Sequence, residues 1–213
     1  TVPKGKTVAL VGQSGSGKST LVDLLPRYHD VQEGTITIDG VNIKDVRISD
    51  LRSLIGNVNQ EAILFNDTFF NNIAFGVENA TMEQVIEAAK IANAHDFIMS
   101  LPNGYETDIG QRGIKLSGGQ KQRLSIARAI ARQPEILIFD DSFSALDYKT
   151  DRILREALRK ECKDATKIIV AQRIGTIRDA DKIIVLDDGQ IAGMGTHDEL
   201  MKNCEVYQEI AYS

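Results

Sequence analysis

One segment near the start of the chain has residue types and spacing suited to holding an anion. It reads Gly12-Gln-Ser-Gly-Ser-Gly17-Lys18-Ser19, follows an apolar stretch and leads into a helical pattern. Small residues let backbone N–H groups wrap a phosphate, a lysine supplies a charge to the outer phosphates, and a serine hydroxyl can ligate Mg²⁺. The alternative is a flexible glycine turn, which the strand and helix on either side argue against. The predicted phosphate-binding residues are Gly12, Gln13, Ser14, Gly15, Ser16, Gly17, Lys18, Ser19 and Thr20.

A second group is a pair of carboxylates. Asp140 and Asp141 follow the apolar run Ile136–Phe139. Many strands end in aspartate, but ligands of parallel sheets gather at the carboxyl ends of strands, where the phosphate loop would also lie. We therefore expect Asp140 to be a Mg²⁺ ligand with Ser19. Asp141 can orient an attacking water, although alone it would be a solvated turn residue.

A third group is Leu116, Ser117, Gly118, Gly119 and Gln120, just before a helical pattern. Two adjacent glycines at a helix start let backbone amides approach a second anion closely, and the serine can donate to it. A plain glycine-containing helix cap is the alternative. The position of this segment, between a phosphate loop and a strand that ends in aspartate, favours the anion-binding interpretation.

The elements that must position these groups alternate between strands and helices. Three apolar runs are typical of buried parallel strands, whereas Asp39-Gly40 and Asp188-Gly189 predict antiparallel hairpins. The chain from about 66 to 130 is instead helical, with a capping box at Thr81 and a helix over 117–130. Further helices are expected over 18–25 and 150–160 and after Thr196, where Thr196 with Glu199 predicts a second capping box. The predicted fold is α/β, a P-loop NTPase core with a mostly parallel sheet, an antiparallel β region and an inserted α-helical subdomain.

Composition narrows the class of protein. The 213 residues are 42% hydrophobic and 26% charged, with a net charge of −5, which excludes collagen-like, disordered and coiled-coil chains. No run of consecutive apolar residues exceeds four, far short of the roughly 20 that a membrane span needs. The acidic balance predicts no nucleic-acid partner. Cys162 and Cys204 have no metal-site spacing and are expected to be free thiols.

Taken together, the motifs resemble the nucleotide-binding domain of ABC transporters over nearly the whole chain. By this resemblance, Gly12 to Ser19 is the Walker A loop, Asp140 ends the Walker B strand, and Leu116 to Gln120 is the signature motif. The resemblance implies that Gln60 is a Q-loop residue that contacts Mg²⁺. It implies a D-loop made of Ser144, Ala145, Leu146 and Asp147.

The resemblance also implies how the domain is divided and what it binds. It predicts one ABC nucleotide-binding domain over 1–213, truncated at its N-terminus, with a RecA-like core and β subdomain over 1–65 and 131–213. Residues 66–130 would form the helical subdomain that carries the signature. The implied cofactors are ATP and Mg²⁺. In this family ATP lies between two domains, one giving Walker A and the other its signature, so a second nucleotide-binding domain is an expected partner.

Two stretches resemble the exporter branch of the family. They are Leu64-Phe65 with Asn71-Asn72-Ile73, and Tyr105 to Gly110 before the signature. In exporters these stretches face helices of the membrane domains. The resemblance thus predicts transmembrane domains as partners, a location at the cytoplasmic face of a membrane, and coupling of ATP binding and hydrolysis to transport. An aromatic residue that stacks on adenine in the family does not precede the loop here, so we expect weaker adenine contacts.

Two residues depart from the family pattern at the catalytic positions. Asp141 stands where the family usually has glutamate, and Gln172 stands where it usually has a histidine. Aspartate has about 1.5 Å less reach, and glutamine cannot carry charge. Both changes weaken attack on the γ-phosphate. The pattern predicts the degenerate-site subunit of a heterodimeric exporter, which binds ATP and hydrolyses it slowly; two tolerated variants in a working ATPase are the alternative.

Other classes remain open at this point. A soluble ABC ATPase of DNA repair or translation usually carries a coiled-coil insertion or a tandem second copy, and neither occurs here. A non-hydrolysing regulatory module, in which ATP only clamps a dimer, lies close to the degenerate-site hypothesis. An unrelated P-loop kinase has no use for Leu116 to Gln120.

Overall fold

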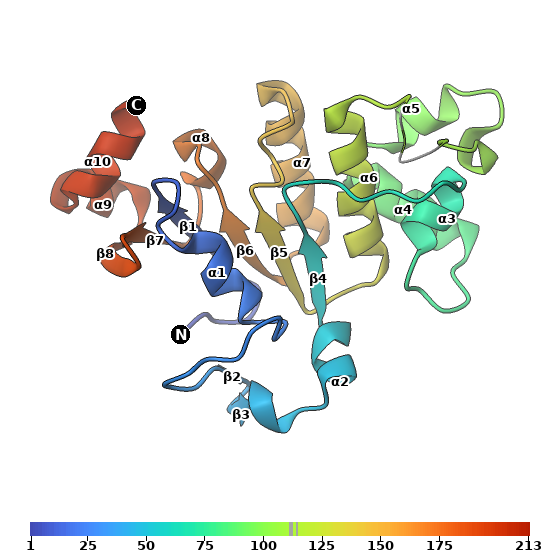
Figure 1. Ribbon diagram of the computed structural model, residues 1–213. Coiled ribbons are helices and arrows are strands. Elements are labelled where there is room, and N and C mark those ends of the chain that lie inside the picture. Colours follow the sequence, from blue (N-terminus) through green and yellow to red (C-terminus); the bar gives the residue numbers. More distant parts are fainter. Residues whose placement is uncertain (111–112, 114) are drawn as a thin grey trace.

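The computed structural model describes residues 1–110, 113 and 115–213. At its centre lies a six-stranded sheet in the order β4-β5-β6-β1-β7-β8 (Figure 1). All neighbours in this sheet are parallel except β7 and β8, which form an antiparallel hairpin. The strands are β1 Thr7–Gly12, β4 Ile55–Val58, β5 Ile136–Asp140, β6 Thr166–Val170, β7 Lys182–Asp187 and β8 Gln190–Gly195. The predicted α/β fold with a mostly parallel sheet is confirmed.

The central strands are apolar because helices cover both faces of the sheet. Successive β1 residues alternate between two cores: Ala9 and Val11 face one, whereas Leu10 packs in the other. The first core includes residues of α6 Gly118–Ala131 and α7 Tyr148–Glu161. The second includes residues of α1 Lys18–Asp23 and α2 Ile48–Ser53. This two-sided burial fixes β1 rigidly, and the phosphate loop follows directly from its end.

Both predicted hairpins occur, and their turns have the same chemistry. Asp39 and Gly40 have φ of 50° and 80°, and Asp188 and Gly189 have φ of 47° and 76°. Two successive positive φ angles suit the twist of a tight hairpin, and Asp-Gly tolerates them. The first hairpin is shorter than predicted: β2 Thr37–Ile38 pairs with β3 Val41–Asn42, and the 3₁₀ turn η1 Ile43–Asp45 follows.

Helices occupy most of the segment between β4 and β5 and lie at one side of the sheet (Figure 1). They are α3 Phe69–Ala74, α4 Met82–Ile91, α5 His95–Met99, the 3₁₀ turn η2 Gly104–Glu106 and α6 Gly118–Ala131. The predicted capping box at Thr81 with Gln84 is present, and Ser117 with Gln120 forms another that was not predicted. The second predicted box, at Thr196 with Glu199, is also present near the end of the chain. Each box satisfies two backbone N–H groups that a helix start would otherwise leave unpaired.

The remaining helices differ from the predictions at their ends. α1 ends at Asp23 rather than near Leu25, because the last turn tightens: the Leu24 and Leu25 amides donate to carbonyls three residues back. The helix predicted after Thr196 is two helices, α9 His197–Asn203 and α10 Glu205–Tyr212, separated by Cys204 in extended conformation. The short helix α8 Ile174–Ile177 was not predicted. Within the described ranges, no helix has the length and apolar character to cross a membrane.

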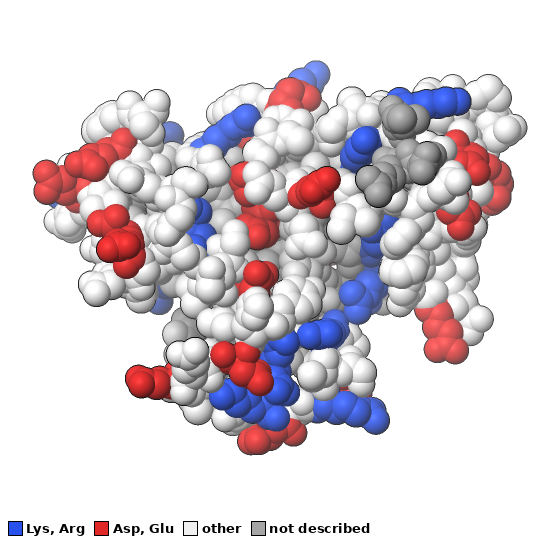
Figure 2. All heavy atoms as spheres, viewed as in Figure 1, with Lys and Arg blue, Asp and Glu red and all other residues white. Residues whose placement is uncertain are grey.

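Figure 2 shows Lys and Arg side chains interspersed with Asp and Glu over the face in view. Several arginines near the small β2–β3 sheet are engaged within the protein. Arg27 pairs with Asp30, while Arg52 donates to the carbonyls of Pro26 and Arg27 and Arg132 to those of Ile55 and Arg52. These guanidinium groups join neighbouring segments, so their charge serves the fold. That this protein has no nucleic-acid partner remains a prediction.

Candidate functional site

The loop between β1 and α1 has the close packing that a phosphate cradle needs. A Cβ added at Gly12 would lie 2.3 Å from the Leu186 carbonyl oxygen and 2.5 Å from Ser16 Oγ. No side chain fits there, because real Cβ contacts do not approach this closely. Gly17, just before α1, has φ of 100°, which favours glycine. The loop geometry therefore depends on glycine at both ends.

Lys18 is buried beneath this loop, with 8% of its surface exposed. Its ammonium donates hydrogen bonds to the carbonyl oxygens of Gly12 at 2.8 Å and Gln13 at 2.9 Å. Burial lowers the pKa of Lys18, and the charges of Asp141 and Asp140 oppose that shift. A cation held close to the loop by carbonyl oxygens can turn to phosphate oxygens, which are stronger acceptors.

Ser19 and Asp140 meet although they lie far apart in sequence. The Ser19 hydroxyl donates to Asp140 Oδ1 at 3.0 Å. Burial raises the pKa of Asp140, and the hydrogen bond from Ser19 opposes that rise. A hydroxyl and a carboxylate side by side are the hard oxygen donors that Mg²⁺ takes. The part of the chain that the structure describes has no cluster of three His, Cys, Asp or Glu side chains able to hold a metal.

The ends of four neighbouring strands and the phosphate loop enclose one hollow of about 260 Å³. The hollow is lined by Ser14, Gly15, Gly17, Lys18, Ser19, Thr20, Gln60, Asp140, Asp141, Val170 and Gln172. Most of the predicted nucleotide, metal and catalytic residues are thus together. Gly12 and Ser16 are buried under the loop, and Gln13 contributes its carbonyl to Lys18.

Asp141 has an unusual backbone for a residue with a side chain. Its φ is 49°, and its N–H donates to the Val170 carbonyl at 2.8 Å. Aspartate tolerates this left-handed conformation better than most residues do. Burial raises the pKa of Asp141, and the neighbouring charge of Asp140 raises it further. The two carboxylates therefore favour a cation between or beside them.

The signature segment lies outside this hollow. Ser117 and Gly118 are exposed, and the capping box fixes them: Ser117 Oγ accepts from the Gln120 amide at 3.1 Å, and Gln120 Oε1 accepts from the Ser117 amide at 3.0 Å. The segment therefore lies on the surface of the protein, and none of its residues lines the hollow that contains Lys18.

The predicted D-loop lies beside the signature segment. A Cβ added at Gly119 would be 3.3 Å from the Ala145 carbonyl oxygen and 3.7 Å from Leu146. Arg173 fixes the loop by donating to the carbonyls of Ser144 at 3.1 Å and Leu146 at 3.4 Å. Asp147 caps α7 by accepting from the Thr150 amide. Sequence reasoning did not find Arg173, because it stands next to Gln172 as an ordinary surface cation.

The two exporter-like stretches are joined in the structure. Thr68 and Asp108 form an isolated antiparallel bridge, and the Phe69 amide donates to the Thr107 carbonyl at 3.1 Å. Buried Asn72 accepts from the Phe65 amide at 2.8 Å. The chain thus forms one continuous surface from segments far apart in sequence.

A groove of about 440 Å³ lies beside this surface, with exposed Ile63, Phe65 and Phe75 along it. The Arg128 guanidinium stacks 4.9 Å from the Phe65 ring centroid and donates to the Ile63 carbonyl at 2.7 Å. Sequence reasoning missed Arg128, because a charged residue on a helix is usually solvated. Its role is to hold the aromatic wall of the groove in place.

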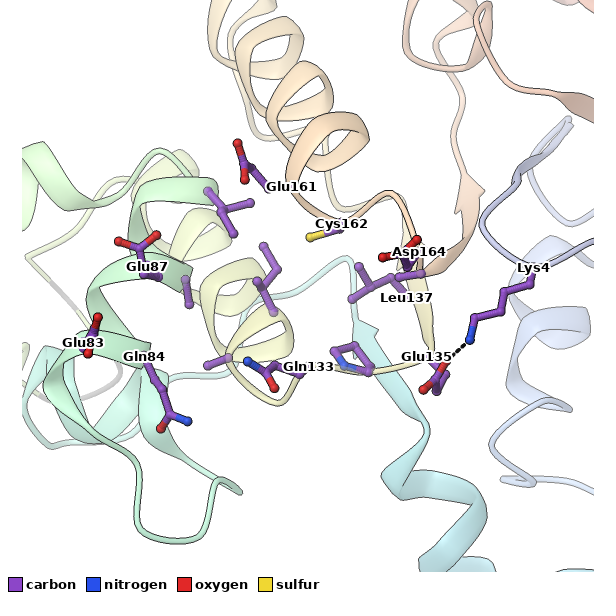
Figure 3. Close-up of a pocket in the computed structure, with 16 residues that line it drawn as sticks. Lys4, Glu83, Gln84, Glu87, Gln133, Glu135, Leu137, Glu161, Cys162 and Asp164 are labelled. Carbon is purple, nitrogen blue, oxygen red and sulfur yellow. Dashed lines mark ion pairs between the residues drawn. The ribbon is translucent and has the colours of Figure 1, made fainter.

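A larger hollow, of about 460 Å³, lies between α4, the end of α6 and the end of α7 (Figure 3). It shares no lining residue with the nucleotide-type hollow. Glu83, Glu87, Glu161 and Asp164 line it, and its lysine, Lys4, is paired with Glu135 at 3.1 Å. An acidic rim repels phosphate, so this larger hollow does not suit a phosphate ligand.

Comparison with known proteins agrees with this geometry. Residues 1–144 match the family described as ABC transporter. The chain is 55% identical over 210 residues to a putative multidrug export ATP-binding/permease protein of Staphylococcus aureus strain NCTC 8325, and 54% identical to that of strain RF122. The match covers 99% of this chain and 36% of each relative's length.

A solved structure of a bacterial Atm1-family ABC exporter with ATP bound is also similar. Its TM-score is 0.93 at 46% identity, covering 97% of this chain and 36% of that one. The chain therefore belongs to the ABC transporter family, and its fold is that of the family's ATPase domain.

Proposed function

We propose that this chain binds Mg·ATP in the hollow at the strand ends and acts as the ATP-binding and hydrolysing domain of an exporter. The observation that carries the proposal is the contact between Ser19 and Asp140, 3.0 Å apart and beside Lys18 in one hollow. A hydroxyl, a carboxylate and a buried cation at the end of a phosphate loop suit a nucleoside triphosphate with its metal.

In this proposal each side chain has a separate task. Lys18 exchanges its carbonyl partners for phosphate oxygens, and the loop amides of Gly12 to Thr20 cradle the phosphates. Ser19, Gln60 and Asp140 hold Mg²⁺, which when bound neutralises charge on the outer phosphates. Asp141 accepts a hydrogen bond from the attacking water, and Gln172 donates one to the γ-phosphate.

We further propose that hydrolysis in this hollow is slow. Asp141 and Gln172 line the same hollow as Lys18, so their departures from the family pattern fall on the reacting end of the nucleotide. A shorter carboxylate and a neutral amide weaken positioning and charge stabilisation, whereas the groups that bind ATP are unaffected. The chain would then be the degenerate-site subunit of a heterodimeric exporter. In the limiting case of slow hydrolysis, the chain is a regulatory module in which ATP holds a dimer together and is not hydrolysed.

The exposed signature segment supports a second nucleotide-binding domain as partner. Residues 116–120 would bind the ATP held by that partner, and the D-loop residues 144–147 would lie at the same interface. The groove beside Phe65 and Phe75 supports docking of helices from transmembrane domains, since exposed aromatic and aliphatic side chains suit an apolar helix face. That partner would place the domain at the cytoplasmic face of a membrane. A soluble ABC ATPase would have no occupant for this groove.

We also propose the division into two lobes, with the core over 1–65 and 131–213 and the helical subdomain over 66–130. Helices α3 to α6 between β4 and β5 support it. In this arrangement the helical lobe presents the signature, and the core presents the phosphate loop.

The proposal that ATP is bound between the phosphate loop of one domain and the signature segment of another is tested with two variants. One variant has a defective phosphate loop, the other has a defective signature segment, and they are studied alone and mixed. Lys18→Met removes the ammonium group that would bind phosphate, whereas Gly118→Asp places a negative charge in the signature segment. An added side chain at Gly118 meets only Ala145 Cβ at 4.0 Å, and aspartate suits the first turn of a helix, so this variant is expected to fold.

Sedimentation velocity with saturating Mg·ATP gives the readout. Two copies of this chain stand in for the two unlike domains of the proposed heterodimer, because each copy carries both a phosphate loop and a signature segment. The wild type is expected to dimerise in this way, each variant alone to stay monomeric, and the 1:1 mixture to form a dimer with one intact site. If either variant dimerises alone as well as the wild type, ATP is not shared between a phosphate loop and a signature. If the wild type itself stays monomeric, pairing of two copies is excluded in favour of an unlike partner domain.

A further inference from the structure

Three successive backbone carbonyls, starting with that of the last residue of β4, are held by two buried side chains from different parts of the fold. The Ser142 hydroxyl donates to the Val58 carbonyl at 2.7 Å. The Gln122 side-chain amide donates to the Asn59 carbonyl at 3.3 Å and also to the Gln60 carbonyl. Ser142 and Gln122 are 0% and 2% exposed. The segment that carries Gln60 is therefore anchored at each of its first three residues.

The two anchors connect this segment to different elements. Ser142 directly follows Asp141, so the first anchor belongs to the end of β5. Gln122 lies in α6, whose first residues are the signature segment and whose N-cap is Ser117. The second anchor therefore joins the segment of Gln60, whose own position lines the nucleotide hollow, to the helix that presents Ser117 to the outside.

The orientation of the Gln122 amide favours a role other than stability. Its Oε1 is buried with no hydrogen-bond partner among the residues that the structure describes. An unpaired buried acceptor destabilises a fold, and a methionine would fill the same volume without one. The donor side of the amide, which holds two carbonyls, is the part that the fold uses.

We infer that Gln122 is a positioning residue for the metal end of the nucleotide site. Its amide holds the backbone of Gln60 so that the Gln60 side chain points to Mg²⁺, and it ties that position to the placement of the chain's own signature helix. The inference rests on the proposed function, in which Gln60 is a Mg²⁺ ligand.

The test measures ATP affinity of the full-length protein that carries this chain, once in Mg²⁺ and once in EDTA. The ratio of the affinity in Mg²⁺ to the affinity in EDTA, which we call the Mg²⁺-dependent gain, reports the contribution of the metal end of the site alone. Gln122→Met is expected to leave the affinity in EDTA within twofold of wild type and to lower the Mg²⁺-dependent gain about fivefold. Gln60→Ala is expected to lower the same gain at least as much, and the double variant no further than Gln60→Ala.

Leu124→Val is the matched control, because Leu124 is a fully buried α6 residue two positions on whose side chain cannot donate a hydrogen bond to the Gln60 segment. It is expected to lower the melting temperature and to leave the Mg²⁺-dependent gain unchanged. Gln122→Leu, which also removes the donor and adds no buried charge, serves if Gln122→Met does not fold.

Three results would overturn the inference. Effects of Gln122→Met and Gln60→Ala that multiply would show that the two residues act independently. An equal loss in EDTA would make Gln122 merely structural. A Gln60→Ala variant with an unchanged gain would leave Gln122 with no ligand to position, while ATP binding through Lys18 would still stand. Failure of the proposed function is distinct, since the wild type would then show no Mg²⁺-dependent ATP binding at all.

Discussion

The proposed degenerate site predicts that restoring the family residues at positions 141 and 172 will speed ATP hydrolysis. The variants are Asp141→Glu, Gln172→His and their combination. Both side chains line the hollow that holds Lys18 and Ser19, so each change acts next to the reacting phosphate. Asp141→Glu adds one methylene, about 1.5 Å of reach toward the water.

The expected size of the effect follows from what each group gains. A well-placed base contributes about 10²- to 10⁴-fold, so recovering part of that for Asp141→Glu predicts a gain of about 10- to 100-fold in turnover. A charged hydrogen bond from histidine exceeds a neutral one from glutamine by about 1 kcal/mol, which is about fivefold. Because the two groups act on one transition state, the double variant is expected to exceed either single variant.

The backbone predicts a cost that accompanies the gain. Residue 141 has φ of 49°, which aspartate tolerates better than glutamate. Asp141→Glu should therefore destabilise the domain by about 1 kcal/mol and lower its melting temperature by about 2–4 °C. A variant that is faster and less stable would agree with the structure on both counts.

The assay is phosphate release at saturating Mg·ATP, with Kd for ATP measured in parallel. Unchanged Kd with increased turnover would place the defect in the chemical step. Fast turnover by the unmodified protein, or a double variant no faster than wild type, would refute the degenerate-site reasoning.

Three further predictions concern the loop, the signature and the carboxylates. Gly12→Ala forces a Cβ to 2.3 Å from the Leu186 carbonyl oxygen, so we expect a lower melting temperature and at least about tenfold weaker ATP binding in a titration; normal binding would show that the loop can yield. Ser117→Ala removes a capping acceptor worth about 1 kcal/mol, which calorimetry should register as about 2–4 °C, yet the ATP Kd of the monomer should not change. Asp141→Asn should stabilise the nucleotide-free protein at neutral pH, because burial and Asp140 raise the pKa of Asp141 in the folded state. This advantage should be complete above that raised pKa and vanish as the pH falls below the ordinary aspartate pKa of about 4; melting curves across pH that show no such change would contradict the shift.

The sequence was sufficient to predict features that depend on local chemistry. The Asp-Gly turns, the capping boxes at Thr81 and Thr196, and the strand before Gly12 were all predicted, because each has its own short-range signal. We also expected Ser19 and Asp140 to lie close together, because the parallel strands that precede them end at the same edge of one sheet. In the structure the Ser19 hydroxyl is 3.0 Å from Asp140 Oδ1.

Features that depend on tertiary packing were not predictable in the same way. Arg128, Arg173 and Gln122 look like polar surface residues in the sequence, yet each donates to backbone carbonyls of distant segments. The split between α9 and α10 at Cys204 depends on packing of that buried side chain rather than on a helix-breaking residue. A single sequence contains no local signal for such contacts.

The most direct test of the account is a calorimetric titration of the protein with ATP in Mg²⁺, comparing the wild type with Lys18→Met and Gly118→Asp. The account predicts that Lys18→Met weakens binding by about 10- to 150-fold, because a charged hydrogen bond to phosphate is worth about 1.5–3 kcal/mol. It predicts that Gly118→Asp binds ATP as the wild type does at concentrations where the protein is monomeric. Equal ATP affinity for Lys18→Met and wild type would contradict the assignment of the hollow at the strand ends as the nucleotide site.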